Sequence, residues 1–298
     1  MQAITATNSV LEIISSSIPL PQPDEVLVRT TAIGINYADL LIRKGIYPKP
    51  QPVMPGEIEG VIEQVGGNVK HLQAGQRVTG YATEGYAEYA TIPASQAFLV
   101  PDDLPTGNGL LVQGLTAQHL LSQSGAPSSI IITAAAGGVG SFAIQLAKLK
   151  GIKTIIALSG SKEKQQYTSA LGATHSLHYN DVIDMEANVI LDAIGGGTAA
   201  TLVAKLAPHG TMIVYGGTAM QPTNINVQQL MYRSNKIIGS TIYAVSFEQK
   251  QQWFNELTRL VREGKLAFPL TTYPFADAAK AHQAIEGRET RGKVALIV

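Results

Sequence analysis

Three glycines near the middle of the chain have the spacing of a phosphate-binding loop. In IITAAAGGVGSFAIQLAKLKG (131–151) a β-branched run ends at Thr133, and the glycines stand directly before a helical pattern. Against the dinucleotide motif G-x-G-x-x-G, Ala replaces the first glycine. A tight strand-to-helix turn needing positive φ is the alternative interpretation. We expect the backbone to approach a pyrophosphate here and the helix N-terminus to bind it, through Gly137, Gly138, Val139 and Gly140.

The next strand, KTIIALS, predicts which dinucleotide binds. A site for NAD would carry Asp or Glu near the end of this strand, to accept the ribose hydroxyls. Here the strand ends in Ser159, Gly160 and Ser161, followed by Lys162, Glu163 and Lys164. Hydroxyls and lysines suit a 2′-phosphate, although the lysines could also be a solvated helix start. The cofactor predicted is NADPH, with Ser159, Ser161 and Lys164 at its 2′-phosphate.

The elements that must position these residues change character along the chain. The first hundred residues contain short alternating runs such as EVLVRTTAIGI and GYAEYATIP, which predict a β-rich domain. From about residue 109, strand-like runs alternate with helical patterns, among them TAATLVAKLAP, which predicts a parallel sheet. We therefore expect an α/β protein with a nucleotide-binding domain at 109–246. The β-rich domain is expected to comprise 1–108 and 247–298.

Composition excludes several classes of function. The 298 residues carry a formal net charge of zero, which does not favour nucleic acid or an anionic membrane surface as a partner. There is no cysteine, so thiol nucleophiles, disulfides and cysteine-ligated zinc are excluded. The sequence shows neither a signal peptide nor an apolar run long enough to span a membrane, and the expected location is the cytoplasm.

Five ordered segments resemble a known family. They are AIGINYADLLIRKGIYP, GYAEYATIP, VQGLTAQHLL, the glycine loop with its helix, and GRETRGKVALIV. Together they resemble the zinc-independent quinone oxidoreductases of the medium-chain dehydrogenase/reductase superfamily. The resemblance implies a GroES-like β-rich domain, formed by both ends of the chain, and a Rossmann domain, with the active site in the cleft. It also implies a homodimer joined through the last Rossmann strand, NKIIGSTIY.

The resemblance also assigns roles to individual residues. Asn36 is expected beside the nicotinamide, although a turn-capping role is the alternative. Tyr47 is expected to hydrogen-bond the substrate carbonyl or supply a proton, although it could simply pack in the loop. Asp39 is expected to hold local structure. Further cofactor contacts implied by the family are Thr116, Tyr179, Gly216, Gly217, Thr218, Thr241, Tyr243 and Arg288.

Zinc is not expected. Zinc alcohol dehydrogenases resemble this sequence but carry a catalytic Cys where Asn36 stands and a His near Gly56. The six histidines are scattered, and His175 and His178 lie in or beside a predicted strand without a third ligand. We expect structural or surface roles for them, and no metal site.

The predicted function is hydride transfer from NADPH to a quinone or another α,β-unsaturated carbonyl. A 2-enoyl thioester reductase is the alternative within enzymes, because its family shares the spacing of Asn36, Asp39, Gly45 and Tyr47. A non-catalytic NADPH-binding protein, either a redox sensor or a structural protein, is the alternative from another class.

Overall fold

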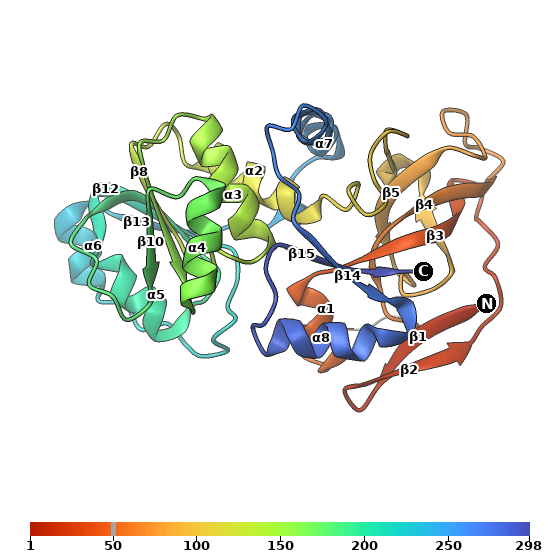
Figure 1. Cartoon of the computed structure of the whole chain (residues 1–298), viewed down its shortest axis with the longest axis horizontal. Helices are drawn as coiled ribbons and strands as arrows, with labels where there is room; N and C mark the ends of the chain where they lie inside the picture. The colour runs from red at the N-terminus through yellow and green to blue at the C-terminus, as the bar shows by residue number, and fades with distance from the viewer. Residues whose placement is uncertain (49–51) are drawn as a thin grey trace. The chain divides into compact units, whose positions relative to one another are not determined.

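The computed structural model describes residues 1–48 and 52–298, and Figure 1 shows the course of the chain. The chain folds into two compact units. Unit 1 consists of Met1–Val112 and Phe247–Val298, and unit 2 consists of Gln113–Ser246.

Unit 2 is built on a six-stranded parallel sheet with the order β10-β9-β8-β11-β12-β13. In chain order this is 3-2-1-4-5-6, the doubly wound Rossmann arrangement, so the predicted α/β fold is confirmed. The strands are β8 (Ser129–Ile132), β9 (Thr154–Ser159), β10 (His175–His178), β11 (Ala187–Asp192), β12 (Leu206–Val214) and β13 (Lys236–Gly239).

The helices of unit 2 alternate with its strands. Helices α3 and α4 pack against β8, β9 and β10, and α5 and α6 pack against β12 (Figure 1). Consecutive residues of β9 and β11 are buried, as expected for strands covered on both faces. The helices are α2 (Val112–Gln123), α3 (Gly138–Leu149), α4 (Lys162–Leu171), α5 (Gly196–Val203) and α6 (Val227–Arg233), with the 3-10 turn η2 (Ile242–Ala244) after β13.

One boundary in unit 2 differs from the sequence interpretation. The run TAATLVAKLAP reads as helical throughout, yet α5 ends at Val203 and β12 begins at Leu206. Leu206 pairs with Ala187 of β11, and the Ala187 N–H donates to the carbonyl of Lys205 at 2.8 Å. Pairing with the sheet therefore overrides local helix propensity in these residues.

Unit 1 contains a mixed seven-stranded sheet built from both ends of the chain. Its path is β14-β15-β3-β4-β5-β7, with β6 paired to β3, and β15 runs antiparallel to β3. The C-terminal segment therefore completes the sheet begun by the N-terminal segment. The strands are β3 (Glu25–Ile35), β4 (Gly56–Val65), β5 (Arg77–Ala82), β6 (Tyr89–Pro93), β7 (Phe98–Leu99), β14 (Leu270–Pro274) and β15 (Lys293–Ile297).

Smaller elements complete unit 1. A hairpin of β1 (Gln2–Thr7) and β2 (Val10–Ser15) forms a two-stranded sheet, and 3-10 turns lie at η1 (Ala94–Gln96) and η3 (Phe275–Asp277). The helices are α1 (Tyr37–Arg43), α7 (Phe247–Arg262) and α8 (Ala278–Glu286). Helix α7 carries the protein's single tryptophan, Trp253.

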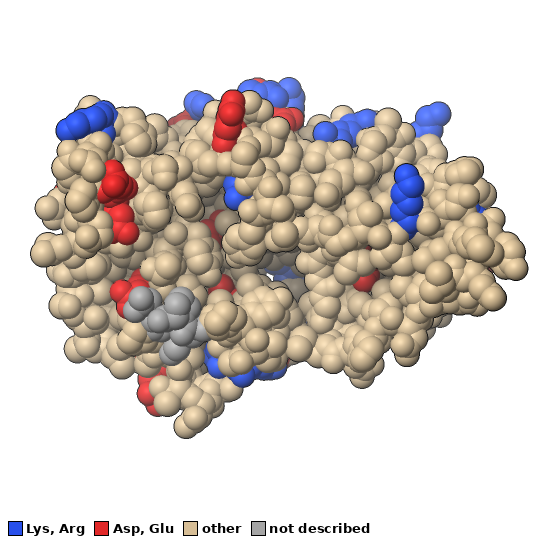
Figure 2. Space-filling view, turned by 180° about the vertical axis from the view of Figure 1, so that it is seen from behind, with Lys and Arg blue, Asp and Glu red and all other residues tan. Residues whose placement is uncertain are grey.

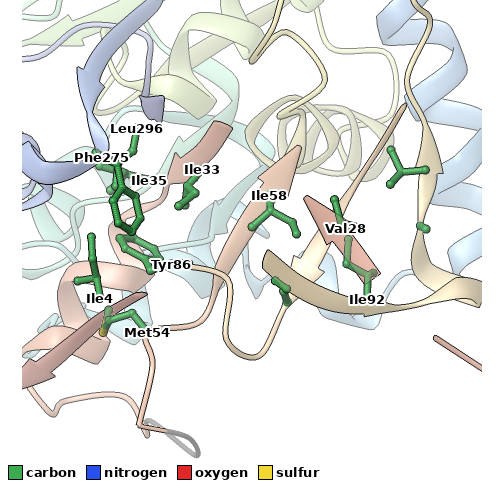
Figure 3. Close-up of a cluster of buried hydrophobic side chains, with 14 of the residues drawn as sticks. Ile4, Val28, Ile33, Ile35, Met54, Ile58, Tyr86, Ile92, Phe275 and Leu296 are labelled. Atoms are coloured by element: carbon green, nitrogen blue, oxygen red, sulfur yellow. The ribbon is translucent and has the colours of Figure 1, made fainter. Parts of the chain in front are cut away.

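The core of unit 1 is aliphatic, with one large aromatic residue that carries a polar group. Figure 3 shows the Tyr86 ring close to Ile4, Met54 and Phe275, and all four side chains belong to the buried cluster. Tyr86 is 0% exposed. A buried phenol hydroxyl needs a hydrogen-bond partner, and this requirement places polar groups inside the core.

The charge distribution agrees with the neutral composition. On the face drawn in Figure 2 the charged side chains are scattered, without a broad basic area. Within residues 1–48 and 52–298, no helix has both the length and the apolar character needed to cross a bilayer.

Candidate functional site

The glycine loop connects β8 to α3 in unit 2. Ala134 has a φ of +46°, and its N–H donates to the Tyr179 hydroxyl at 2.7 Å. A Cβ at Gly140 would lie 2.6 Å from the backbone of Ala135, so close packing requires glycine there. Beside Gly137 a Cβ would meet only the Ala134 carbonyl, at 3.2 Å. The space next to Gly137 is therefore open to a group that approaches the backbone, at the N-terminus of a 12-residue helix.

Gln113 lies against the same loop. A Cβ built on Gly138 would fall 1.6 Å from the Gln113 Oε1 atom, so no larger residue fits at Gly138 with this side chain in place. The carboxamide oxygen thus lies beside the first turn of α3, where the helix dipole favours negative charge.

A buried carboxylate holds the neighbouring strand ends together. Asp192, at the end of β11, accepts from the Thr133 hydroxyl at 3.0 Å and from the Gly195 N–H at 2.9 Å. The sequence analysis missed Asp192. Its signal was an acidic residue at the end of a buried strand, three residues before Gly195 in the run Gly195–Gly197, where an Asp can accept from loop N–H groups.

The end of β9 carries the residues predicted at a 2′-phosphate. Ser161 is the N-cap of α4, and its hydroxyl oxygen accepts from the Lys164 N–H at 3.3 Å. The Ser159 hydroxyl is buried and has no hydrogen-bond partner among the described residues. Glu163 lies in the first turn of α4 and is exposed. The strand end thus offers a hydroxyl that a ligand could satisfy, and no carboxylate at the strand tip.

The remaining residues predicted in unit 2 gather at the carboxyl ends of the parallel strands, except Thr116, which lies half-buried in α2. Thr218 N–H donates to the Ala193 carbonyl at 3.0 Å, which joins the segment after β12 to the segment after β11. Ligands bind at this edge in doubly wound sheets. The residues that follow strands β10, β12 and β13 are Tyr179, Gly216, Gly217, Thr218, Thr241 and Tyr243.

In unit 1, Asn36 stands between β3 and α1 and contacts two charged residues. Lys293 Nζ donates to Asn36 Oδ1 at 3.3 Å, and Asn36 Nδ2 donates to Glu57 Oε2 at 3.2 Å. Lys293 and Glu57 also form an ion pair, and each residue is 1% exposed. We name Asn36, Glu57 and Lys293 the ion-pair cluster. Sequence reasoning missed Glu57 and Lys293, whose signal was a charge within or beside an apolar strand.

A second group of buried polar side chains lies beside it. The Asp39 carboxylate accepts the Asn36 N–H at 2.8 Å, which is the local structural role expected of it, and the Tyr86 hydroxyl lies 3.3 Å from the same oxygen. The Tyr86 hydroxyl also lies 3.0 Å from His282 Nε2. We name Asp39, Tyr86 and His282 the tyrosine cluster.

Burial shifts the ionisation of the tyrosine cluster. Desolvation raises the pKa of Asp39 to about 7, against the lowering effect of the Asn36 N–H. Desolvation, with the charge of Arg43, lowers the pKa of His282 to about 3. Both shifts favour the neutral form, because burial disfavours charge of either sign.

Tyr47 and Arg288 lie at the surface of unit 1. Tyr47 follows α1, is 48% exposed, and donates its backbone N–H to the Leu41 carbonyl at 3.2 Å. Arg288 follows α8 with a φ of +58° and is exposed. The structure does not bring Tyr47 into the ion-pair cluster with Asn36, so its predicted role remains a prediction.

Among the residues that the structure describes, no group of three or more His, Asp or Glu side chains is arranged to hold a metal ion. His175 and His178 lie in β10, and the His175 ring contacts Thr174.

Comparison with known proteins identifies the relatives of this chain. Residues 22–102 match the family model "Alcohol dehydrogenase GroES-like domain", and residues 138–262 match "Zinc-binding dehydrogenase". Quinone oxidoreductase from Pseudomonas aeruginosa is 31% identical over 303 residues, covering 93% of this chain and 92% of the relative. The chain belongs to the quinone oxidoreductase family. The predicted family, within the medium-chain dehydrogenase/reductase superfamily, and the GroES-like fold are thereby confirmed.

Solved structures of this family share the whole fold. Escherichia coli quinone oxidoreductase complexed with NADPH matches with a TM-score of 0.90 at 27% identity, covering 100% of both chains. A mycobacterial protein complexed with NADPH matches with a TM-score of 0.92 at 29% identity, again covering 100% of both chains.

Proposed function

We propose that this protein is an NADPH-dependent oxidoreductase that transfers hydride to a quinone or another α,β-unsaturated carbonyl compound. The observation that carries the proposal is the end of β9. There a buried Ser159 hydroxyl lacks a partner among the described residues, and no carboxylate stands at the strand tip. A 2′-phosphate would accept a hydrogen bond from that hydroxyl, whereas an NAD site would carry an acid. Membership of a family with NADPH-bound structures supports the same cofactor.

The glycine loop fits the diphosphate of this cofactor. The open space beside Gly137 admits phosphate oxygens, and the first turn of α3 supplies N–H donors and the positive end of a helix dipole. In this proposal Ser159, Ser161 and Lys164 hold the 2′-phosphate. Ser161 can still donate its hydroxyl proton while its oxygen caps α4.

Bound NADPH supplies the hydride, and the chain's own residues orient the reactants and stabilise negative charge. The Asn36 amide offers an N–H donor beside the reacting groups. The Tyr47 hydroxyl would donate a hydrogen bond to the substrate carbonyl oxygen as that oxygen gains charge, and could supply the proton that completes reduction.

We propose further that no zinc takes part. The chain has no cysteine, and Asn36 stands where the resemblance places a catalytic cysteine in zinc alcohol dehydrogenases. Quinones and activated alkenes accept hydride readily, so hydrogen bonds can replace a Lewis acid. Glu57 and Lys293, beside Asn36, form an ion pair rather than a set of metal ligands.

We also propose a homodimer formed through β13. This strand ends the sheet order of unit 2, and an edge strand of the sequence KIIG is an aggregation hazard unless it is covered. Large apolar side chains nearby are exposed, namely Val227, Met231, Tyr232 and Tyr243. Sedimentation should give a dimer for the native chain and a monomer after Met231→Glu with Tyr232→Glu. A native monomer would contradict the proposal.

The experiment that tests the function combines a binding titration with a substrate screen. NADPH should bind, and absorbance of NADPH should fall with quinones or enones, with and without a chelator. Turnover of enoyl-CoA alone would indicate a 2-enoyl thioester reductase. NADPH binding without turnover of any of these compounds would indicate a non-catalytic NADPH-binding protein. Loss of activity with the chelator would contradict zinc independence.

A further inference from the structure

The Asn36 amide lies between a cation and an anion. Its oxygen accepts from Lys293, and its nitrogen donates to Glu57, at 3.3 and 3.2 Å. The other carboxylate oxygen of Glu57 accepts the Val112 N–H at 2.8 Å. Both oxygens of Glu57 and both ends of the amide therefore have defined partners.

These partners permit only one orientation of the amide. Rotation by 180° would place Nδ2, a donor, against the Lys293 ammonium, which has no acceptor. It would also place Oδ1 against the Glu57 carboxylate, which has no donor. Two hydrogen bonds would become two repulsive contacts, in a setting where burial strengthens both.

One donor hydrogen remains for a ligand. Nδ2 carries two hydrogens, and Glu57 accepts one of them. We propose that Glu57 and Lys293 are positioning residues, which hold the Asn36 amide so that its second N–H faces the bound cofactor or substrate. This inference rests on the proposed function, in which Asn36 contacts one of those molecules.

Packing keeps the pair in place. A Cβ on Gly34 would lie 2.6 Å from Glu57 Oε2 and 2.7 Å from Lys293 Nζ, so the charged atoms lie directly over this glycine. A buried ion pair is a weak source of stability, and apolar residues of similar volume often serve equally well. Orienting an amide dipole is something that an apolar pair could not do.

A double-mutant cycle tests the inference. The neutral variant combines Glu57→Gln with Lys293→Gln, whose amides can satisfy either orientation of Asn36. We expect a kcat lower by about 10- to 100-fold, as for a misplaced catalytic group, with the KM for quinone little changed. Asn36→Ala should cost a similar factor, and combining it with the neutral variant should cost nothing more. If the combined variant instead loses the product of the two separate factors, the pair does not act through Asn36.

A second ion pair in the same sheet supplies a matched control. Arg29 of β3 and Glu63 of β4 form an ion pair whose side chains are 47% and 44% exposed. Neutralising that pair with Arg29→Gln and Glu63→Gln should leave kcat unchanged. An equal loss in this control would assign the effect to general disturbance of the sheet and overturn the inference.

The binding titration separates the two proposals. If the native protein neither binds NADPH nor reduces a quinone, the proposed function fails. If the native protein does both, and the neutral variant keeps native kcat and NADPH affinity, only the positioning inference fails.

Nuclear magnetic resonance of the native protein tests the orientation even if the neutral variant does not fold. With ¹⁵N-labelled asparagine, the Asn36 side-chain signals are assigned by their loss in Asn36→Ala. One Nδ2 proton should exchange slowly with water, because it is bonded to a buried carboxylate. The other should shift when NADPH or, in a separate sample, a quinone is added. Equally fast exchange of both protons, or no shift of either, would overturn the inference.

Discussion

The ion-pair cluster and the tyrosine cluster lie side by side in unit 1 and handle buried charge in opposite ways. In the ion-pair cluster, Glu57 and Lys293 lie against each other as a buried pair of opposite charges. In the tyrosine cluster, Asp39 and His282 shift toward their neutral forms, and Asp39 Oδ1 and His282 Nδ1 have no partner among the described residues. The energetic cost of burying a charged group can therefore be reduced by pairing it with an opposite charge or by shifting it to its neutral form.

Both clusters hold the same residue. The ion-pair cluster binds the Asn36 side chain, and the tyrosine cluster binds its backbone N–H through Asp39. A buried ion pair thus lies where an amide must be oriented, and groups shifted toward their neutral forms lie where the chain only needs to be anchored.

The largest effect should come from breaking the ion-pair cluster on one side only. Lys293→Met leaves the Glu57 carboxylate buried without its cation, and we expect a loss of about 3–5 kcal/mol in the free energy of unfolding. Adding Glu57→Gln should restore most of that stability. Denaturant unfolding can be followed by the fluorescence of Trp253, which lies in unit 1. Equal stability of the single and double variants would contradict the description of a mutually neutralised pair.

The tyrosine cluster should affect how the free energy of unfolding depends on pH. The pKa of Asp39 rises from 3.8 to about 7 on folding, so its contribution to stability falls as pH rises through that window. The pKa of His282 falls from 6.5 to about 3, so its contribution rises with pH between those values. The two contributions oppose each other, and native stability should change little between pH 4 and pH 6.5 from this source.

Single substitutions should separate the pH dependence that Asp39 contributes to stability from the opposite one that His282 contributes. Asp39→Asn should leave stability rising with pH between about 4 and 6, by up to about 1.4 kcal/mol per pH unit relative to the native protein. His282→Gln should produce the opposite slope. The measurement is urea unfolding at a series of pH values. Parallel stability profiles for all three proteins would contradict the assigned shifts.

Tyr47 provides a contrast to Asp39. Asp39 is buried within α1, whereas Tyr47 follows that helix and its side chain is exposed. Tyr47→Phe should leave the unfolding free energy unchanged and lower kcat, since it removes a hydrogen bond expected mainly in the transition state. A preorganised donor of this kind is worth about 10²-fold or more, and for an easily reduced quinone the loss should lie at or below that value. A less activated enone should lose more. Native kcat on every substrate would mean that Tyr47 only lines the site, and a collapse of NADPH affinity would assign it to binding.

The smallest effect is expected at Ser159 in unit 2, which resembles Asp39 in carrying a buried polar atom without a described partner. Ser159→Ala should weaken NADPH binding by about tenfold, or roughly 1.4 kcal/mol, and leave NADH binding unchanged. Stability without cofactor should stay the same or rise, because an unsatisfied hydroxyl is removed. Matched titrations of the two dinucleotides check this. Equal weakening of both would contradict a role at the 2′-phosphate.

Local patterns were sufficient where a site is contiguous in the chain. The glycine loop and the serines at the end of β9 could be proposed as a dinucleotide site from sequence, because strand, turn and helix start follow one another within a few residues. The alternation of strands and helices likewise predicted the parallel sheet of unit 2. The end of α5 was misplaced, because Leu206 pairs with a strand that local propensity does not report.

The surroundings of Asn36 required the tertiary structure. Glu57 lies opposite Gly34 in the register of β3 and β4, and Gly34 lies opposite Ala295, two residues after Lys293, in the register of β15 and β3. The Tyr86 hydroxyl, which contacts Asp39, also contacts His282, 196 residues away in the chain. The sequence by itself determined the residue types, the glycine loop and the absence of cysteine. Only the tertiary structure decided which charges meet, because long-range strand register, not neighbouring residues, sets the distances between them. Burial, which the sequence does not report either, shifts the ionisation of Asp39 and His282.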